Sequence, residues 1–132
     1  MDLGSKCSAL PSFPILNKLI DANKDLSIQV HPNDEYALAN ENANGKSELW
    51  YVVDAMPNSF IYLGFSKDVT EVEILERIKN NSILEVINKI PVKPGDCYFV
   101  PAGTIHAIGS GCFIYEIQEN SNITYRVYDY DR

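Results

Sequence analysis

Residues 94–108 read PGDCYFVPAGTIHAI. Two groups of turn-forming residues, Pro94-Gly95 and Pro101 with Gly103, enclose a short β-prone run. His106 follows the second group and is one of 2 histidines in the chain. The stretch therefore predicts a strand, a tight turn and then a histidine at the start of the next segment.

The sequence around this stretch reads as many short strands. Segment 26–31, LSIQVH, alternates with period two and puts Gln29 and His31 on one face, about 7 Å apart. Segments 48–55, 59–65, 112–118 and 124–131 are also β-rich. Within residues 70–89, capping-box patterns at Thr70/Glu73 and Ser82/Glu85 predict two short helices. The pattern favours an antiparallel β-barrel or jelly roll with a brief helical insert.

Size and charge limit the classes of function. The chain has 132 residues, enough for one domain, and a formal net charge of -7. This charge argues against nucleic-acid and membrane-surface partners, because both are polyanions. The 3 cysteines show no metal-binding or disulfide pattern, no stretch is long and apolar enough to span a membrane, and no secretion signal is recognisable. We therefore expect a cytoplasmic protein.

Polar side chains from three separate segments can ligate a metal. Gln29 and His31 share one strand face, Glu48 begins the next β-rich run, and His106 follows the second turn. An amide oxygen, two imidazoles and a carboxylate suit a zinc-like divalent ion with one position left open. On spacing alone, the commoner alternative for each histidine is a surface or hydrogen-bonded residue.

The spacing of Gly95, Pro101, Gly103 and His106 resembles the second sequence motif of the cupin superfamily. The series QVHP (29–32), GKSELWY (45–51), VPAGTIHAIG (100–109) and TYRVYDYDR (124–132) resembles type I mannose-6-phosphate isomerases, particularly the short bacterial form. The resemblance covers residues 12–132. The usual first cupin motif pairs two histidines with a nearby glutamate, whereas Gln29 pairs with His31 here and Glu48 comes seventeen positions later.

This resemblance implies a mainly β, cupin-type antiparallel jelly-roll barrel. It implies one zinc ion per chain, with other divalent transition metals as alternatives, and the ligands Gln29, His31, Glu48 and His106. It also implies a catalytic Arg126, with Lys46 and Glu116 in the substrate pocket. The implied reaction interconverts mannose 6-phosphate and fructose 6-phosphate through an enediol.

The chemistry of that reaction agrees with the residues available. It needs a group that polarises a carbonyl, an acid/base and local cations for the phosphate. The candidate cations in this acidic chain are Lys46, Lys93, Arg126 and Arg132. A solvated surface charge is the alternative for each of them. Glu116 is a candidate acid/base or a device that orients a neighbouring group.

The domain expectation is a single cupin domain over residues 1–132, with residues 1–12 as a loosely ordered lead-in and residues 70–89 as the helical insert. The second cupin domain of the family is expected to be absent. We expect an open sheet edge and hence a homodimer. The alternative to an isomerase is a metal-binding cupin module that binds a sugar or sugar phosphate without turnover.

Overall fold

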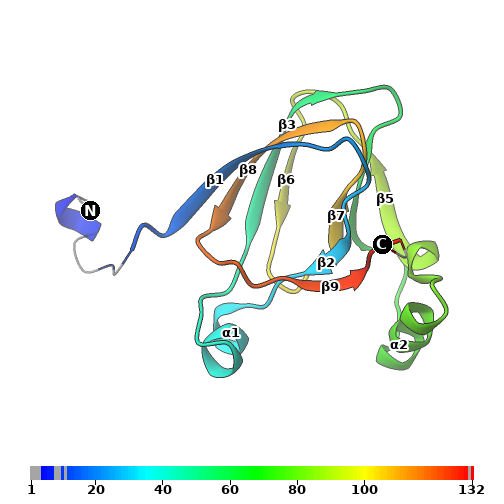
Figure 1. The fold of residues 1–132 in the computed structure, drawn as a ribbon, viewed down its shortest axis with the longest axis horizontal. Coiled ribbons are helices and arrows are strands. Elements are labelled where there is room, and N and C mark those ends of the chain that lie inside the picture. Colours follow the sequence, from blue (N-terminus) through cyan, green and yellow to red (C-terminus); the bar gives the residue numbers. More distant parts are fainter. Residues whose placement is uncertain (1–3, 8–9, 11, 131) are drawn as a thin grey trace.

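The computed structural model describes residues 4–7, 10, 12–130 and 132. In this part of the chain, strands form two antiparallel sheets that face each other (Figure 1). The four-stranded sheet has the order β1 (Ile15–Asp21), β8 (Cys112–Glu119), β3 (Glu48–Ala55) and β6 (Cys97–Val100). The five-stranded sheet has the order β5 (Ile87–Pro91), β4 (Phe60–Phe65), β7 (His106–Ile108), β2 (Ile28–Val30) and β9 (Tyr125–Tyr128).

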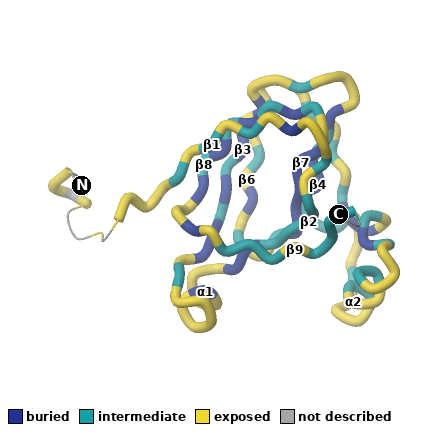
Figure 2. Tube along the Cα trace, in the orientation of Figure 1, coloured by how far each residue is buried: buried dark blue, intermediate teal, exposed yellow. Residues whose placement is uncertain are grey.

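The space between the sheets is filled from both sides. In β8 every second residue from Cys112 to Gln118 is buried, as the pleat of a half-buried strand requires. Trp50 of β3, Ile61 of β4 and Ile114 of β8 are at most 1% exposed and belong to one apolar cluster. Figure 2 shows the buried positions on the facing strands. The inward faces of the two sheets thus form the core, and any polar side chain on these faces lies inside the barrel.

Helices cover one sheet and leave the other open. Helix α2 (Glu71–Lys79) and the 3-10 turn η2 (Ile83–Val86) pack on the outer face of the five-stranded sheet, where Ile28, Tyr62 and Ile83 belong to a second apolar cluster. Helix α1 (Asp34–Asn40) follows β2 and lies, like α2, at the bottom of the view in Figure 1, whereas η1 (Ser5–Cys7) lies apart from the barrel. The outer face of the four-stranded sheet exposes Leu19 and Phe99. Among the described helices, none is long and apolar enough to cross a membrane.

The expected mainly β fold is confirmed, while the helical segment differs in detail. Thr70 caps α2 through a hydrogen bond from the Glu73 amide, but Ser82 makes no side-chain capping bond and opens only a 3-10 turn. The lead-in expected over residues 1–12 falls partly outside the described residues, at 1–3, 8–9 and 11.

Candidate metal centre

Three connecting segments bring the candidate ligands to the same end of the barrel. His31 follows β2, Glu48 begins β3 and His106 begins β7. The Gly103 amide donates to the His31 carbonyl at 2.7 Å, and the Lys46 amide donates to the Pro32 carbonyl at 3.0 Å. These backbone bonds tie the turn before His106 and the segment before Glu48 to the segment that carries His31.

Glycines allow the close approach of these segments. A Cβ on Gly45 would lie 2.5 Å from the backbone of Asn33 and Asp34, well inside van der Waals contact. The Gly45 amide also donates to the Asp34 side chain at 2.8 Å. Gly103 adopts φ +85, a conformation that glycine reaches without steric cost. The glycines of both motifs therefore shape the turns that aim the ligands.

His31, Glu48 and His106 converge inside the barrel. His31 Nε2 lies 3.2 Å from Glu48 Oε1, and His106 Nε2 lies 3.7 Å from Glu48 Oε2. One ligand atom from each residue lies within 4.8 Å of the others, and all three side chains are buried. The four-stranded sheet supplies the carboxylate and the five-stranded sheet supplies both imidazoles.

The hydrogen bonds of the histidines fit a cation between these atoms. Nδ1 of His31 lies 2.9 Å from the Ile123 carbonyl, and Nδ1 of His106 lies 2.7 Å from the Thr104 carbonyl. A carbonyl oxygen only accepts, so each Nδ1 carries a hydrogen and each Nε2 points inward, where its lone pair can bind a metal. Neither Nε2 atom has a hydrogen-bond partner of suitable geometry among the described residues, and Glu48 Oε1 faces the Lys46 ammonium at 3.1 Å. Buried nitrogen acceptors without donors are costly, and a divalent cation between these atoms would satisfy both nitrogens and bind the carboxylate.

The pKa values of this cluster favour the ligand forms. Burial lowers the pKa of His106 to about 4, so its imidazole is neutral near pH 7. Burial by itself raises the pKa of Glu48, but its contact with His31, together with the nearby His106 and Lys46, lowers that pKa to about 2. A neutral imidazole and an ionised carboxylate are the protonation states that bind metal.

Strand register places Gln29 beside this cluster. Gln29 of β2 pairs with His106 of β7 on one side and with Arg126 of β9 on the other. Cross-strand partners point to the same face of a sheet, so the three side chains form a row on the inner face. Gln29 therefore lies next to His106 on the same face of the sheet. Arg126 is exposed at the end of that row.

A second row of cross-strand partners crosses the four-stranded sheet and carries the candidate residue Glu116. Glu116 of β8 pairs with Trp50 of β3, and both are buried. Lys46 is also buried, and its Nζ lies 3.1 Å from Glu48 Oε1. Lys46, Glu48 and Glu116 are thus all buried, and Lys46 contacts Glu48.

Lys18 also contacts the site, although the sequence did not predict it. This residue of β1 pairs with Glu116, and its Nζ lies 3.0 Å from Glu116 Oε1 and contacts the Gln118 side chain. Its side chain is 38% exposed, so it lines the edge of the inner space. The sequence carries little signal for it, because segment 15–21, ILNKLID, shows no alternation of apolar and polar residues, and only the observed strand places Lys18 on the face of Leu16 and Ile20.

Two cations proposed from the sequence lie elsewhere. Lys93 is exposed in the turn before β6, and the neighbouring Asp96 bonds Val52, toward the end of β3 opposite Glu48. Arg132 bonds Asp129 and the Asp25 carbonyl. Neither residue is brought to the cluster.

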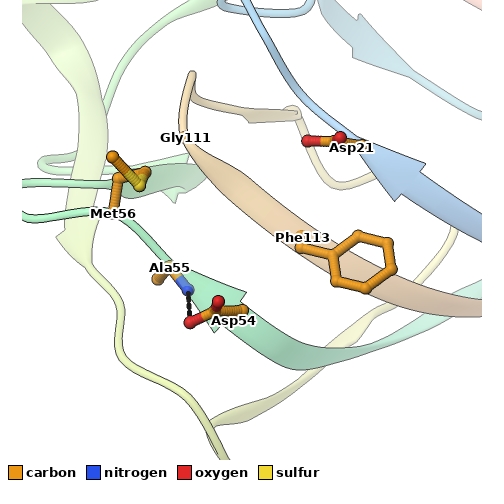
Figure 3. A pocket seen from close by; sticks show the side chains of 6 residues that line it. All are labelled: Asp21, Asp54, Ala55, Met56, Gly111 and Phe113. Atoms are coloured by element: carbon orange, nitrogen blue, oxygen red, sulfur yellow. Dashed lines mark hydrogen bonds between the residues drawn. The ribbon is translucent and has the colours of Figure 1, made fainter.

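A separate hollow lies at that opposite end of the four-stranded sheet. Its volume is about 250 Å³, and Figure 3 shows its lining, namely Asp21, Asp54, Ala55, Met56, Gly111 and Phe113. Asp54 already accepts a hydrogen bond from the Ala55 amide at 2.8 Å, and both aspartates are exposed. The seven residue steps of β3 from Glu48 to Ala55 span about 23 Å, so this hollow is distinct from the buried cluster.

Comparison with known proteins identifies relatives of this arrangement. The family model for the catalytic domain of type I phosphomannose isomerase matches residues 3–54. Mannose-6-phosphate isomerase ManA of Bacillus subtilis (strain 168) is 48% identical over 121 residues, which cover 91% of this chain and 38% of the relative. The mannose-6-phosphate isomerase of Streptococcus mutans is 48% identical over 120 residues. The chain therefore spans 38% of the length of these relatives.

Solved structures agree with the sequence matches. The crystal structure of mannose 6-phosphate isomerase from Bacillus subtilis superposes with a TM-score of 0.87 at 45% identity, covering 91% of this chain and 38% of that one. A phosphomannose isomerase variant from Salmonella typhimurium superposes with a TM-score of 0.68 at 18% identity, a likeness that supports the fold alone. The resemblance predicted from the motifs is confirmed, and so is the cupin-type fold.

Proposed function

We propose that this chain, a homologue of the type I phosphomannose isomerases, carries the metal centre of an aldose–ketose isomerase. The reaction would interconvert mannose 6-phosphate and fructose 6-phosphate through an enediol. The observation that carries the proposal is the convergence of His31 Nε2, His106 Nε2 and the buried Glu48 carboxylate, because both nitrogens lack hydrogen-bond donors of suitable geometry among the described residues. Catalysis and substrate are proposals, because the chain spans 38% of the relatives' length.

The proposed metal is one zinc ion per chain, held by His31, Glu48, His106 and the amide oxygen of Gln29. A mixed nitrogen and oxygen set of this kind suits zinc, although iron, cobalt, nickel and manganese bind such sets too. When bound, zinc supplies a Lewis acid that polarises the oxygens at the sugar carbons. The second imidazole nitrogens donate to carbonyls and hold both rings in their inward orientation.

The substrate's phosphate needs cations in a chain of net charge -7. Arg126 lies at the exposed end of the row that contains His106 and Gln29, where its guanidinium can bind two phosphate oxygens at once. Lys46 forms an ion pair with the proposed ligand Glu48, and Lys18 forms an ion pair with Glu116. The three cations come from different strands and segments, so a phosphate that reaches this end of the barrel would meet positive charge despite the overall repulsion.

Glu116 is the proposed group for proton transfer. One of its oxygens accepts from Lys18 at 3.0 Å and the other from Trp50 at 3.0 Å. Two donors fix the carboxylate plane and leave each oxygen a further lone pair, which can accept a proton from the carbon acid. Arg126, Glu116 and Lys46 are thus the proposed catalytic residues, with Arg126 and Lys46 also stabilising negative charge on the enediol oxygens.

The test is a coupled assay for fructose 6-phosphate formed from mannose 6-phosphate. We expect turnover that a chelator abolishes and that added zinc restores. Arg126→Ala should reduce kcat/KM at least about 100-fold, the loss typical of removing a positioned charged donor. Arg132→Ala is the matched control, because this second C-terminal arginine bonds Asp129 instead, and it should keep wild-type turnover.

A non-catalytic module is the second candidate function. It uses the same buried cluster of His31, Glu48 and His106. Such a module would bind one metal ion and a sugar or sugar phosphate without forming product. Stoichiometric metal together with zero turnover, at substrate concentrations that saturate binding, would support this candidate over the enzyme.

A homodimer and a cytoplasmic location stay predictions from the sequence.

A further inference from the structure

Trp50 bridges the two carboxylates of the site. It is the chain's only tryptophan and is 1% exposed. Its indole Nε1 donates to Glu48 Oε2 at 3.1 Å and to Glu116 Oε2 at 3.0 Å. One hydrogen is therefore shared between the proposed metal ligand and the proposed proton-transfer group.

A shared donor makes its two acceptors compete. The indole N–H has a single hydrogen and cannot ionise, so a stronger bond to one carboxylate weakens the bond to the other. Trp50 cannot shift to serve both, because its ring is packed in the core and lies edge-on to His106, with ring centroids 5.5 Å apart. The competition is settled by the charge on each carboxylate.

Metal binding would change that charge. A cation that draws electron density from Glu48 makes Oε2 a weaker acceptor, and the shared hydrogen then bonds Glu116 more strongly. Glu116 is also held by Lys18 through its other oxygen, so a tighter indole bond fixes the whole carboxylate. Occupancy of the metal site would thereby orient the acid/base before substrate enters.

We propose that Trp50 is a positioning residue that couples the metal ligand Glu48 to Glu116. The inference rests on the proposed function for the role of Glu116, but its physical content is an energetic coupling between two carboxylates through one indole. It also gives the site an intrinsic reporter, because all tryptophan emission from this chain comes from residue 50.

The experiment is a double-mutant cycle read by zinc affinity. Trp50→Phe keeps an aromatic ring but removes the donor, and we expect it to change the zinc Kd about 10-fold, the size of effect typical of a hydrogen bond to a metal ligand. Glu116→Gln should change the zinc Kd in the wild-type background and leave it unchanged in the Trp50→Phe background. Equal effects of Glu116→Gln in both backgrounds would overturn the coupling.

Tyr98→Phe is the matched control. Tyr98 pairs with Trp50 from the other neighbouring strand, and its hydroxyl bonds Asp96 rather than either glutamate. Its loss should leave zinc affinity within twofold of wild type. Thermal midpoints of all variants, measured without metal, separate a coupling effect from loss of fold.

Tryptophan fluorescence tests the same coupling without altering Trp50. Zinc should shift the emission of the wild-type chain, and Glu116→Gln should shift the emission of the metal-free protein. Unchanged emission in both cases would overturn the proposal even if the chain proves to be an active isomerase. A chain that binds zinc with these shifts but shows no turnover would instead refute the proposed isomerase and leave the coupling standing.

Discussion

Gly45 has no side chain, and the structure leaves no room for one. The backbone of Asn33 and Asp34 occupies the space in which a Cβ would lie, at 2.5 Å. Because Lys46 follows directly and Glu48 two residues later, the position of this glycine sets where both charged groups enter the site. A residue without functional atoms thus controls the geometry of the proposed metal centre.

Gly45→Ala should therefore damage both stability and metal binding. The added methyl must push two backbone segments apart, and overpacking of this kind costs about 1–3 kcal/mol. Urea denaturation measures the loss, and zinc titration should show weaker binding. Asn44→Ala, at the exposed neighbouring position, is the control and should stay near wild type in both measurements. A Gly45→Ala protein with wild-type stability would show that the two segments separate freely.

At the scale of single residues, the sequence predicts most of the proposed site but not the contact between Lys18 and Glu116. The four proposed ligands can be predicted because each lies in a motif that resembles a motif of the family. They are Gln29, His31, Glu48 and His106. Lys18 was missed, because a single lysine in a short strand is ordinarily a surface charge. The pairing of β1 with β8 brings Lys18 to Glu116, and that register joins residues 98 positions apart. No local pattern encodes it.

Helix α2 shows how far the sequence predicts a single element. The capping pattern at Thr70 predicts its start, and the Glu73 amide donates to Thr70 Oγ1 at 3.2 Å. Of its apolar residues, Ile78 packs on the second cluster while Val72 and Leu75 are exposed. The Glu73 side chain bonds Lys67 and Arg77 instead of completing a capping box. Competing hydrogen-bond partners determine what such a side chain binds, and these partners are known only from the structure.

Thr70→Ala should destabilise the chain by about 1 kcal/mol, because it leaves the Glu73 amide without its cap. The midpoint of urea denaturation should fall while the slope stays constant. Thr70→Ser keeps the accepting oxygen and should retain most of the stability. If serine and alanine were equally harmful, the lost methyl contact and not the cap would account for the change. Zinc affinity should be unaffected, because α2 packs on the outer face of the five-stranded sheet.

At the level of the whole molecule, the metal centre joins the two sheets. Glu48 comes from the four-stranded sheet, and both histidines come from the segments of the five-stranded sheet. The sequence predicted strands and turns but not this strand order, because antiparallel pairing over long separations depends on the packing of the complete core. An ion held here acts as a link across the core.

Metal removal should therefore lower the thermal stability of the loaded protein. Zinc at 100 times its Kd adds about 2.7 kcal/mol to the free energy of unfolding. We expect a chelator to lower the Tm of the wild-type chain by several degrees. His106→Ala and Glu48→Gln should bind less metal by elemental analysis, and their Tm should no longer respond to chelator. A wild-type Tm that chelator leaves unchanged, with metal shown to be removed, would contradict the link between the sheets.

The position of β2 has a consequence for synthesis. This strand lies between β7 and β9, so both of its hydrogen-bonding neighbours are encoded in the last third of the chain. On the ribosome, the segment around His31 lacks both of these sheet neighbours until residues 106–128 have been made. The site can therefore assemble only after β7 and β9 have emerged, and ions in the cell meet a finished cage rather than a nascent pair of ligands.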